Sequence, residues 1–386
     1  MDRDKKGINT LCTHVGEVAD TRYRGAISPL YMGTAYDFEQ VDKKRYPRYF
    51  NTPNQEALGK KMAALEHTEA ALIFSSGMAA ISTALLALLK AGDHVLLQQT
   101  IYGGTYHLAT TQFERFGIEY SFTDGWGVED FKRGIRPNTR AIYLETPSNP
   151  LLTITDLSGV ASLARERGIP TLIDNTFASP INQNPIDQGI DIVLHSATKY
   201  MGGHSDISAG VVAASKEYIE KVHAAAICLG GNLSDYTVWL LERSMKTLGV
   251  RVRAQNQGAM AMARYLAASK DVDRVHYPGL ESHPGHEIAK GQMHGFGGML
   301  SFELLPGMDA SLFFRQLKLI KPAMSLAGVE STVLSPTQTS HSLLSPEDRE
   351  KQGIKDSLIR FSVGLEEPAD LIGDIEQALA AVKAKG

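Results

Sequence analysis

A lysine shortly after an apolar run is a candidate catalytic residue in this sequence. Lys199 comes after the run 190–195, with Ser196 and Thr198 just before it. In an extended segment, side chains two positions apart face the same way, so the two hydroxyls can bind one phosphate group. The lysine amine can form a Schiff base with a carbonyl cofactor. The alternative is a solvated lysine that simply follows a strand.

An aspartate has the same kind of position earlier in the chain. Asp174 ends the apolar run 171–174, where its carboxylate can keep a pyridine nitrogen protonated. The alternative is an aspartate that caps a helix, because Asn175 and Thr176 also favour turns.

A third segment has the features of an anion site. Ser75-Ser76-Gly77-Met78 lies between a predicted strand and a predicted helix. Small residues at a helix start let an anion approach the free N–H groups of the first turn, and the helix dipole favours negative charge. Taken alone, the segment favours an ordinary serine N-cap. Together with the later strand-end aspartate and lysine, in that order, it indicates a pyridoxal-phosphate site.

These residues need a scaffold that brings strand ends together, and the hydrophobic pattern predicts one. From Asn54 onward, short apolar runs alternate with helix-length segments such as 78–90, 105–116 and 157–168. The predicted strands are 70–74, 94–98, 141–145, 171–174, 190–195 and 210–214. This alternation predicts an α/β fold with a mainly parallel sheet flanked by helices on both faces. In such sheets ligands bind beyond the carboxyl ends of the strands.

The length of 386 residues predicts two or three domains. Residues 1–50 contain aromatics and turn formers without periodicity, and we expect an extended N-terminal arm. Residues 51–249 form the predicted cofactor-binding domain. Beyond them, residues 250–386 are predicted to form a smaller α+β domain, with helices at 251–268, 310–317 and 369–383 and strand-like pieces at 298–304 and 358–365.

Composition excludes several classes of partner. The chain has 39 Lys and Arg against 43 Asp and Glu, with no block of like charge, so we expect neither nucleic-acid nor membrane binding. Two cysteines are too few for a disulfide framework. The charged start runs into no apolar stretch, and the apolar run 78–89 is too short to span a bilayer. We therefore predict a cytoplasmic protein.

Three histidines lie close together but do not indicate a metal site. His276, His283 and His286 fall in a loop marked by Pro and Gly, without the paired helical spacing of a metal-binding motif. We therefore expect no metal.

Several motifs occur in the order found in one known family. They are Tyr102-Gly103-Gly104-Thr105, Glu145-Thr146-Pro147-Ser148-Asn149-Pro150, Asp174-Asn175-Thr176-Phe177 and His195-Ser196-Ala197-Thr198-Lys199-Tyr200. In these motifs the sequence resembles the Cys/Met-metabolism family of pyridoxal-phosphate enzymes, from about Thr13 to the C-terminus. The resemblance implies the fold type I, aminotransferase-like architecture and pyridoxal 5'-phosphate as cofactor.

The resemblance also implies which residues contact the cofactor. Lys199 matches the Schiff-base lysine, which later acts as general base for the substrate α-proton, and Asp174 matches the partner of the pyridinium nitrogen. Tyr102 would stack on the ring and help to deprotonate or steer the substrate amine. The phosphate would be bound by the backbone of Gly77 and Met78, the hydroxyls of Ser196 and Thr198, and a Tyr-x-Arg pair from a neighbouring subunit, matched by Tyr46 and Arg48.

For the substrate, the resemblance implies that Arg360 binds the α-carboxylate, with Ser325 and Asn149 beside it. It also implies a homotetramer built as a dimer of dimers, in which each arm reaches a neighbouring subunit.

The expected reaction is a carbon–sulfur lyase reaction of transsulfuration. Cystathionine would be cleaved by β or γ elimination to a thiol amino acid, ammonia and a 2-oxo acid. Two departures from the family pattern leave alternatives open, because Met324 replaces a common glutamate and His107 stands where γ-lyases often have arginine. The alternatives are a γ-replacement transferase, such as O-acylhomoserine sulfhydrylase or cystathionine γ-synthase, and a methionine γ-lyase.

Overall fold

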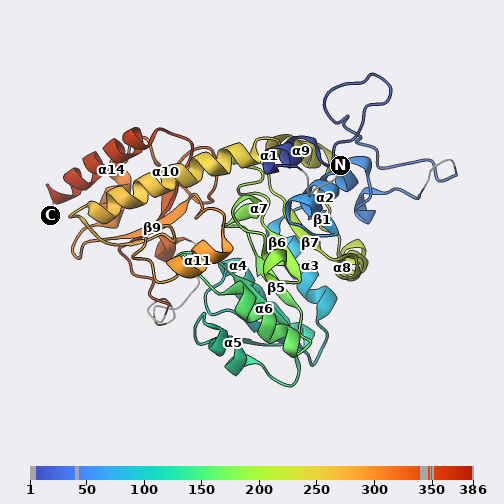
Figure 1. Cartoon of the computed structure of the whole chain (residues 1–386), viewed down its shortest axis with the longest axis horizontal. Helices are drawn as coiled ribbons and strands as arrows, with labels where there is room; N and C mark the ends of the chain where they lie inside the picture. Colours follow the sequence, from blue (N-terminus) through green and yellow to red (C-terminus); the bar gives the residue numbers. More distant parts are fainter. Residues whose placement is uncertain (1–5, 40–42, 340–346, 348, 350–351, 385–386) are drawn as a thin grey trace.

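The computed structural model describes residues 6–39, 43–339, 347, 349 and 352–384. Parts of the predicted arm (1–5 and 40–42) and of the predicted C-terminal domain therefore lie outside the described residues. Figure 1 shows two groups of strands, with helix α10 (Leu248–Ala268) running from one group towards the other.

The larger sheet has seven strands in the order β1-β7-β6-β5-β4-β2-β3. The strands are β1 (Ala70–Phe74), β2 (His94–Leu97), β3 (Glu119–Phe122), β4 (Thr139–Glu145), β5 (Thr171–Asp174), β6 (Ile192–His195) and β7 (Gly210–Ala214). Strand β7 is antiparallel to both neighbours, and the other pairs are parallel. The prediction of a mainly parallel sheet is confirmed. The sequence does not predict β3, an edge strand whose side chains are only partly buried.

Helices cover both faces of this sheet, because alternate strand residues point to opposite sides. On β1, Leu72 and Phe74 pack with α3 and α8, whereas Ile73 packs with α2 and α9 on the other face. The helices of this region are α2 (Pro53–Leu65), α3 (Gly77–Leu88), α4 (Gly103–Leu108), α5 (Val128–Gly134), α6 (Leu157–Glu166), α7 (Ser179–Asn182), α8 (Lys216–Leu229) and α9 (Asp235–Met245). Short 3-10 turns lie at Pro47–Tyr49 (η2), Glu114–Phe116 (η4) and Pro185–Gln188 (η5), and a π-helical turn lies at Ala109–Phe113 (η3).

The second sheet has five strands in the order β10-β11-β12-β9-β8. They are β8 (Val272–His276), β9 (Met299–Leu304), β10 (Lys321–Pro322), β11 (Thr332–Leu334) and β12 (Leu358–Ser362). Its core packs against α10, α12 (Ala310–Gln316) and α14 (Pro368–Lys383), while α11 (His286–Gln292) and the 3-10 turn η6 (Pro336–Gln338) lie in its connections. Only β9 and β12 match predicted strands, because β8 and β10 are too exposed to form apolar runs.

Helix α10 belongs to both cores. Leu248 and Val252 near its start are buried with the first sheet, whereas Met262 and Leu266 near its end are buried with the second. Its start coincides with the predicted boundary after residue 249, so one continuous helix crosses that boundary. The division into domains 51–249 and 250–386 stays a prediction.

The N-terminal region begins with a helix that the sequence analysis does not predict. Helix α1 (Ile8–His14) packs on α2 and α10, and Lys61 donates to the carbonyl of Cys12 at 2.7 Å. Between Val15 and Tyr46 the described residues form neither helix nor strand, and this segment projects from the molecule at the upper right of Figure 1. It carries exposed large apolar side chains, among them Tyr23, Met32 and Phe38.

Candidate active site

Three acidic or basic side chains end adjacent parallel strands at one edge of the large sheet. Glu145 ends β4, Asp174 ends β5 and His195 ends β6. The pairing places Glu145 opposite Asp174, and Asp174 opposite Leu194, the residue before His195. The strand ends thus bring together groups that are far apart in the sequence, as the sequence analysis predicts for Asp174.

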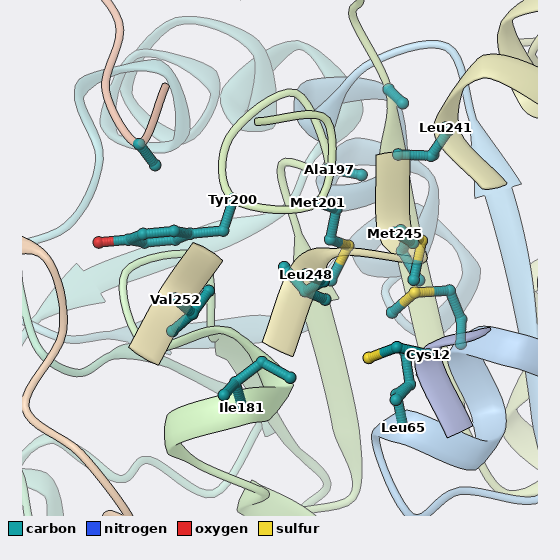
Figure 2. Close-up of a cluster of buried hydrophobic side chains, with 14 of the residues drawn as sticks. Cys12, Leu65, Ile181, Ala197, Tyr200, Met201, Leu241, Met245, Leu248 and Val252 are labelled. Atoms are coloured by element: carbon teal, nitrogen blue, oxygen red, sulfur yellow. The ribbon is translucent and has the colours of Figure 1, made fainter. Parts of the chain in front are cut away.

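The turn after β6 presents Lys199. It is closed by hydrogen bonds from the N–H of Gly202 to the carbonyl of Ala197 (2.8 Å) and from that of Gly203 to the carbonyl of Lys199 (2.7 Å). Figure 2 shows that Ala197, Tyr200 and Met201 of this turn lie among buried side chains of neighbouring helices; the other labelled residues are Cys12, Leu65, Ile181, Leu241, Met245, Leu248 and Val252. This packing fixes the backbone that carries Lys199.

The amine of Lys199 lies beside residues of the second sheet. Its Nζ donates to Oγ of Ser325 at 2.8 Å. Burial, together with the nearby Arg360 guanidinium, lowers the pKa of Lys199 from 10.5 to about 8, although Asp174 opposes the shift. The amine is therefore unusually easy to deprotonate.

The guanidinium of Arg360, on β12, is buried next to the lysine. It donates to Oδ1 of Asn149 at 3.1 Å and to the carbonyl oxygen of Ser325 at 2.9 Å. Burial lowers its pKa to about 10, so it stays positively charged at neutral pH. The structure therefore brings Arg360, Ser325, Asn149 and Lys199 together, as the sequence analysis predicts.

The loop that contains Ser325 has an unusual backbone. Ser325 has φ +80° and Ala327 has φ +62°, values that non-glycine residues rarely adopt. The loop is held by a hydrogen bond from the N–H of Ala327 to Ser362 (2.7 Å) and another from Gln255 to the carbonyl of Gly328 (2.9 Å). Such backbone strain is typical of functional sites.

The start of α3 forms a cradle against the turn that contains Ser196. Ser76 caps the helix by accepting from the N–H of Ala79 at 3.0 Å, while the first N–H groups of a helix have no intrahelical acceptor. A Cβ atom on Gly77 would lie only 2.8 Å from the Cβ of Ser196. Only glycine therefore leaves room for an anion at this helix start.

The two hydroxyls predicted to bind the phosphate, those of Ser196 and Thr198, have different surroundings in the structure. Ser196 follows β6 beside Gly77, and its N–H donates to Thr176 at 2.8 Å. The hydroxyl of Thr198 donates to the carbonyl of Ala209 at 3.2 Å and accepts from the N–H of the same residue at 3.0 Å. In this structure the Thr198 hydroxyl thus ties the lysine turn to the start of β7.

Asp174 provides a buried carboxylate next to this cradle. It accepts from the N–H of Thr176 at 3.0 Å. Burial raises its pKa, while hydrogen bonds from Thr176 and the nearby His195 and Lys199 act in the opposite direction. A carboxylate in such surroundings is best stabilised by a cationic partner, and a protonated pyridine nitrogen is one. The cradle at Gly77 and the buried Asp174 carboxylate therefore fit pyridoxal phosphate.

Glu145 is a site residue that the sequence analysis does not assign. One carboxylate oxygen accepts from the N–H of Tyr102 at 2.7 Å, and the other accepts from the N–H of Asn149 at 3.0 Å. The Glu145 carboxylate thus positions both Tyr102, which is predicted to stack on the cofactor ring, and Asn149, which binds Arg360. Burial raises its pKa. A charged residue at the end of the apolar run 141–145 is the sequence signal that identifies it.

Tyr102 lies at the start of α4. A Cβ atom on Gly104 would lie 2.5 Å from Cε1 of Tyr102, so glycine there leaves space for the ring. Burial and the nearby Asp174 and Glu145 raise the pKa of the phenol, which is therefore neutral at neutral pH.

Tyr46 and Arg48 lie apart from this group within the chain. Arg48 donates to the carbonyl of Ile227 on α8, and its guanidinium lies 5.7 Å from the ring centre of Tyr46 and 5.3 Å from that of Tyr49. Tyr46 and Arg48 are both exposed. Their role at the site of a neighbouring subunit stays a prediction.

Neither a metal-binding cluster nor a membrane-crossing helix occurs among the described residues. In that part of the chain, no group of three or more His, Cys, Asp or Glu side chains is arranged to hold a metal ion. None of the described helices combines the length and apolar character needed to cross a membrane.

The two-sheet architecture and the Lys199, Asp174 and Arg360 arrangement define a fold type I pyridoxal-phosphate enzyme. A family model described as Cys/Met metabolism PLP-dependent enzyme matches residues 9–380. The chain belongs to this family, and pyridoxal phosphate is its cofactor.

Individual relatives agree with this assignment. The chain is 46% identical over 374 residues to a cystathionine gamma-lyase of Bacillus subtilis, covering 96% of this chain and 98% of that protein. It is 43% identical to a cystathionine beta-lyase of Lactococcus lactis, with the same coverage, and 40% identical to an L-methionine gamma-lyase of Fusobacterium nucleatum over 99% of this chain and 100% of that protein. The crystal structure of cystathionine gamma-lyase from Lactobacillus plantarum complexed with L-serine superposes with a TM-score of 0.94 at 39% identity, covering 98% of this chain and 100% of that one.

Proposed function

We propose that this protein is a carbon–sulfur lyase that cleaves cystathionine by β or γ elimination, releasing a thiol amino acid, ammonia and a 2-oxo acid. One geometric observation carries the proposal. Lys199 donates to the hydroxyl of Ser325 while Arg360 donates to the carbonyl of the same residue. The α-carbon of an amino acid carries both a carboxylate and the proton to be removed, so a base and a carboxylate-binding cation must lie this close together.

Each residue has a definite task in this reaction. When bound, pyridoxal phosphate supplies an electron-poor ring that takes up the electron pair left at the α-carbon. Nζ of Lys199 removes the α-proton, which its pKa of about 8 makes efficient near neutral pH. Arg360 and Asn149 hold the α-carboxylate next to Ser325. The raised pKa keeps the Tyr102 phenol protonated, so its oxygen would steer the substrate by accepting a hydrogen bond from the substrate ammonium group.

The proposed cofactor contacts are those that the family resemblance implies. Asp174 pairs with the ring nitrogen, and Tyr102 stacks on the ring. The phosphate is bound by the N–H groups of Gly77 and Met78 and by the hydroxyls of Ser196 and Thr198; for Thr198 this requires its hydrogen to leave the carbonyl of Ala209. Tyr46 and Arg48 complete the phosphate site of a neighbouring subunit.

The proposed assembly is a homotetramer formed as a dimer of dimers. The exposed apolar side chains of the arm, such as Tyr23 and Phe38, support it because large apolar groups at a surface mark an interface. We place the enzyme in the cytoplasm, since both of its cysteines, Cys12 and Cys228, are free thiols.

The substrate assignment is tested with purified protein and three separate substrates: cystathionine, methionine, and O-acetylhomoserine with sulfide. Cystathionine cleaved by β elimination gives pyruvate and homocysteine, whereas γ elimination gives 2-oxobutanoate and cysteine, each with ammonia. We expect a 2-oxo acid from cystathionine without added thiol, and the identity of the acid distinguishes the two eliminations.

The other outcomes identify the alternatives. Turnover of O-acetylhomoserine with sulfide, but not of cystathionine, would make the protein a γ-replacement transferase. Methanethiol released from methionine at a higher kcat/KM than cystathionine cleavage would make it a methionine γ-lyase. Lys199→Ala serves as the inactive control for all three assays.

A further inference from the structure

A buried carboxylate and a buried imidazole form a pair directly behind the strand ends of the site. Glu66, the residue that follows α2, is hydrogen-bonded through Oε1 to Nε2 of His195 at the end of β6. Both side chains are almost completely excluded from solvent. Neither has a role in the reaction described above.

Glu66 also contacts the strand that carries Asp174. Its Oε1 accepts from Nδ2 of Asn175, the next residue after Asp174, at 3.3 Å. The N–H of Asn175 in turn donates to the carbonyl of Leu194 at 2.9 Å, next to His195. Oε1 of Glu66 therefore links the end of β5, which carries Asp174, to the end of β6, which precedes Ser196.

The cost of burying Glu66 indicates that the pair has more than a packing role. Its second carboxylate oxygen, Oε2, is buried and has no hydrogen-bond partner among the described residues. A buried polar pair with an unpaired oxygen contributes little to net stability compared with apolar side chains of the same volume.

His195 also has an electrostatic effect on Asp174. It is one of the neighbours that oppose the rise in the pKa of Asp174 caused by burial. A carboxylate must be ionised to pair with a protonated ring nitrogen, so a neighbour that favours ionised Asp174 favours that pairing.

We propose that Glu66 and His195 are positioning residues for Asp174: Glu66 fixes the His195 ring and the end of β5, so that the Asp174 carboxylate stays ionised and aligned with the cofactor's ring nitrogen. Neither residue touches the cofactor. This inference rests on the cofactor role proposed for Asp174.

The experiment measures how fast pyridoxal phosphate leaves the purified holoenzyme, followed as the visible absorption band that stays with the protein after free cofactor is removed by gel filtration at timed intervals. The variant is Glu66→Gln, which keeps the shape and removes the charge. The matched control is Glu303→Gln in the second sheet, because Glu303 is also buried and also pairs with a histidine, His276, at 2.9 Å.

We expect Glu66→Gln to release the cofactor about 10–100-fold faster, the size of effect seen when a residue supporting a ligand-binding group is lost. Glu303→Gln should release it within about twofold of wild type, since Glu303 pairs with His276 and Lys355 rather than with a residue proposed to bind the cofactor. Equal effects of the two variants would overturn the inference.

A double-variant cycle shows whether Glu66 acts through Asp174. If it does, adding Glu66→Gln to Asp174→Asn should accelerate release by less than about twofold beyond Asp174→Asn alone. A full additional 10-fold acceleration would contradict the proposed route. Should Glu66→Gln not fold, as judged by circular dichroism, His195→Gln takes its place with the same expectations.

A wrong cofactor role for Asp174 would give a different result from a wrong role for Glu66. If wild type shows no visible band, or if Asp174→Asn retains the cofactor as wild type does, the cofactor role of Asp174 is wrong, and the inference falls with it. If both behave as expected and Glu66→Gln behaves as wild type, only the inference is wrong.

Discussion

At the scale of single residues, the site places two cationic groups against one serine. Lys199 contacts the Ser325 hydroxyl, and Arg360 contacts its carbonyl oxygen. Two like charges in partly dry surroundings disfavour one another's charged form, and lysine, with the lower intrinsic pKa, is the one that yields its proton. The carboxylate-binding residue thus also activates the base.

The lowered pKa of Lys199 predicts a pH dependence for cofactor uptake. A neutral amine is required to react with an aldehyde, and Lys199 becomes neutral as pH rises through about 8. The rate at which cofactor-depleted protein regains its visible band should therefore rise up to about pH 8 and level off above it. An ordinary lysine, with a pKa of 10.5, would give a rate that is still rising at pH 9.5, and that result would contradict the assignment.

Arg360 gives a second prediction at this scale. Arg360→Lys keeps the charge but loses the planar fork that donates to both Asn149 and Ser325. We expect kcat/KM for amino-acid substrates to fall about 10–100-fold, mainly through a higher KM, since a hydrogen bond to a charged group contributes about 1.5–3 kcal/mol. Cofactor release should stay unchanged; a variant that instead loses cofactor would show that Arg360 supports the ring and not the substrate.

At the scale of elements, the turn after β6 is built around a buried arginine of α10. Arg251 donates to the carbonyls of Tyr200 (2.7 Å), Met201 (3.3 Å) and Ser244 (3.1 Å). Gly203, with φ +68°, has no room for a side chain, since a Cβ atom would lie 2.1 Å from Nη1 of Arg251. The helix that joins the two sheets therefore also fixes the turn that presents Lys199.

This arrangement predicts the effect of Gly203→Ala. Gly168 has a similar φ of +63° but nothing within 4 Å of its Cβ position, so Gly168→Ala measures the backbone cost alone, about 1–2 kcal/mol. Gly203→Ala should cost about 1–3 kcal/mol more, because it also displaces Arg251. Urea unfolding of both variants measures the difference; equal losses of unfolding free energy would show that the turn can shift without cost.

The elements also show what can be predicted from the sequence. Strands β1, β5 and β7 match their predicted bounds because each forms a mainly apolar run; β5 and β7 are buried throughout, and β1 is buried over its last three residues. Partly exposed strands such as β3 and β8 mix polar and apolar residues over too few positions to be recognised. Helix α1 has only seven residues, and its stability comes from packing on α2 and α10.

The same distinction applies to the site. Asp174 and Lys199 are predictable because a charge directly after an apolar strand is conspicuous. The contact between Lys199 and Ser325 joins residues 126 positions apart, and the pair of Glu66 and His195 joins residues 129 positions apart. Nothing in the local sequence marks such pairs, since only the packing of α2 and of the second sheet creates them.

At the scale of the whole molecule, the arm leaves Tyr46 and Arg48 away from the site of their own chain. Exposed Arg48 is held at α8 rather than at the cradle of Gly77. If it serves a neighbouring subunit, each site needs two chains, and the smallest complete unit is a two-fold dimer.

Mixing two inactive variants tests this sharing. Arg48→Ala and Lys199→Ala should each be strongly impaired, but a hybrid dimer contains one site with both defects and one with neither. Random re-association after mild dissociation should restore about a quarter of wild-type activity, because half of the dimers are hybrids with one intact site of two. No recovery in verified hybrids would show that Arg48 acts within its own chain.

The order of the site residues along the chain also has a consequence for synthesis on the ribosome. The large sheet is complete in sequence at Ala214, whereas Ser325 and Arg360 come much later. At about 5–20 residues per second, roughly 7–30 s separate the two events. During translation Lys199 and Asp174 can therefore meet the cofactor before Ser325 and Arg360 exist to complete the substrate site, so the nascent enzyme can be loaded with cofactor before it is able to act on a substrate.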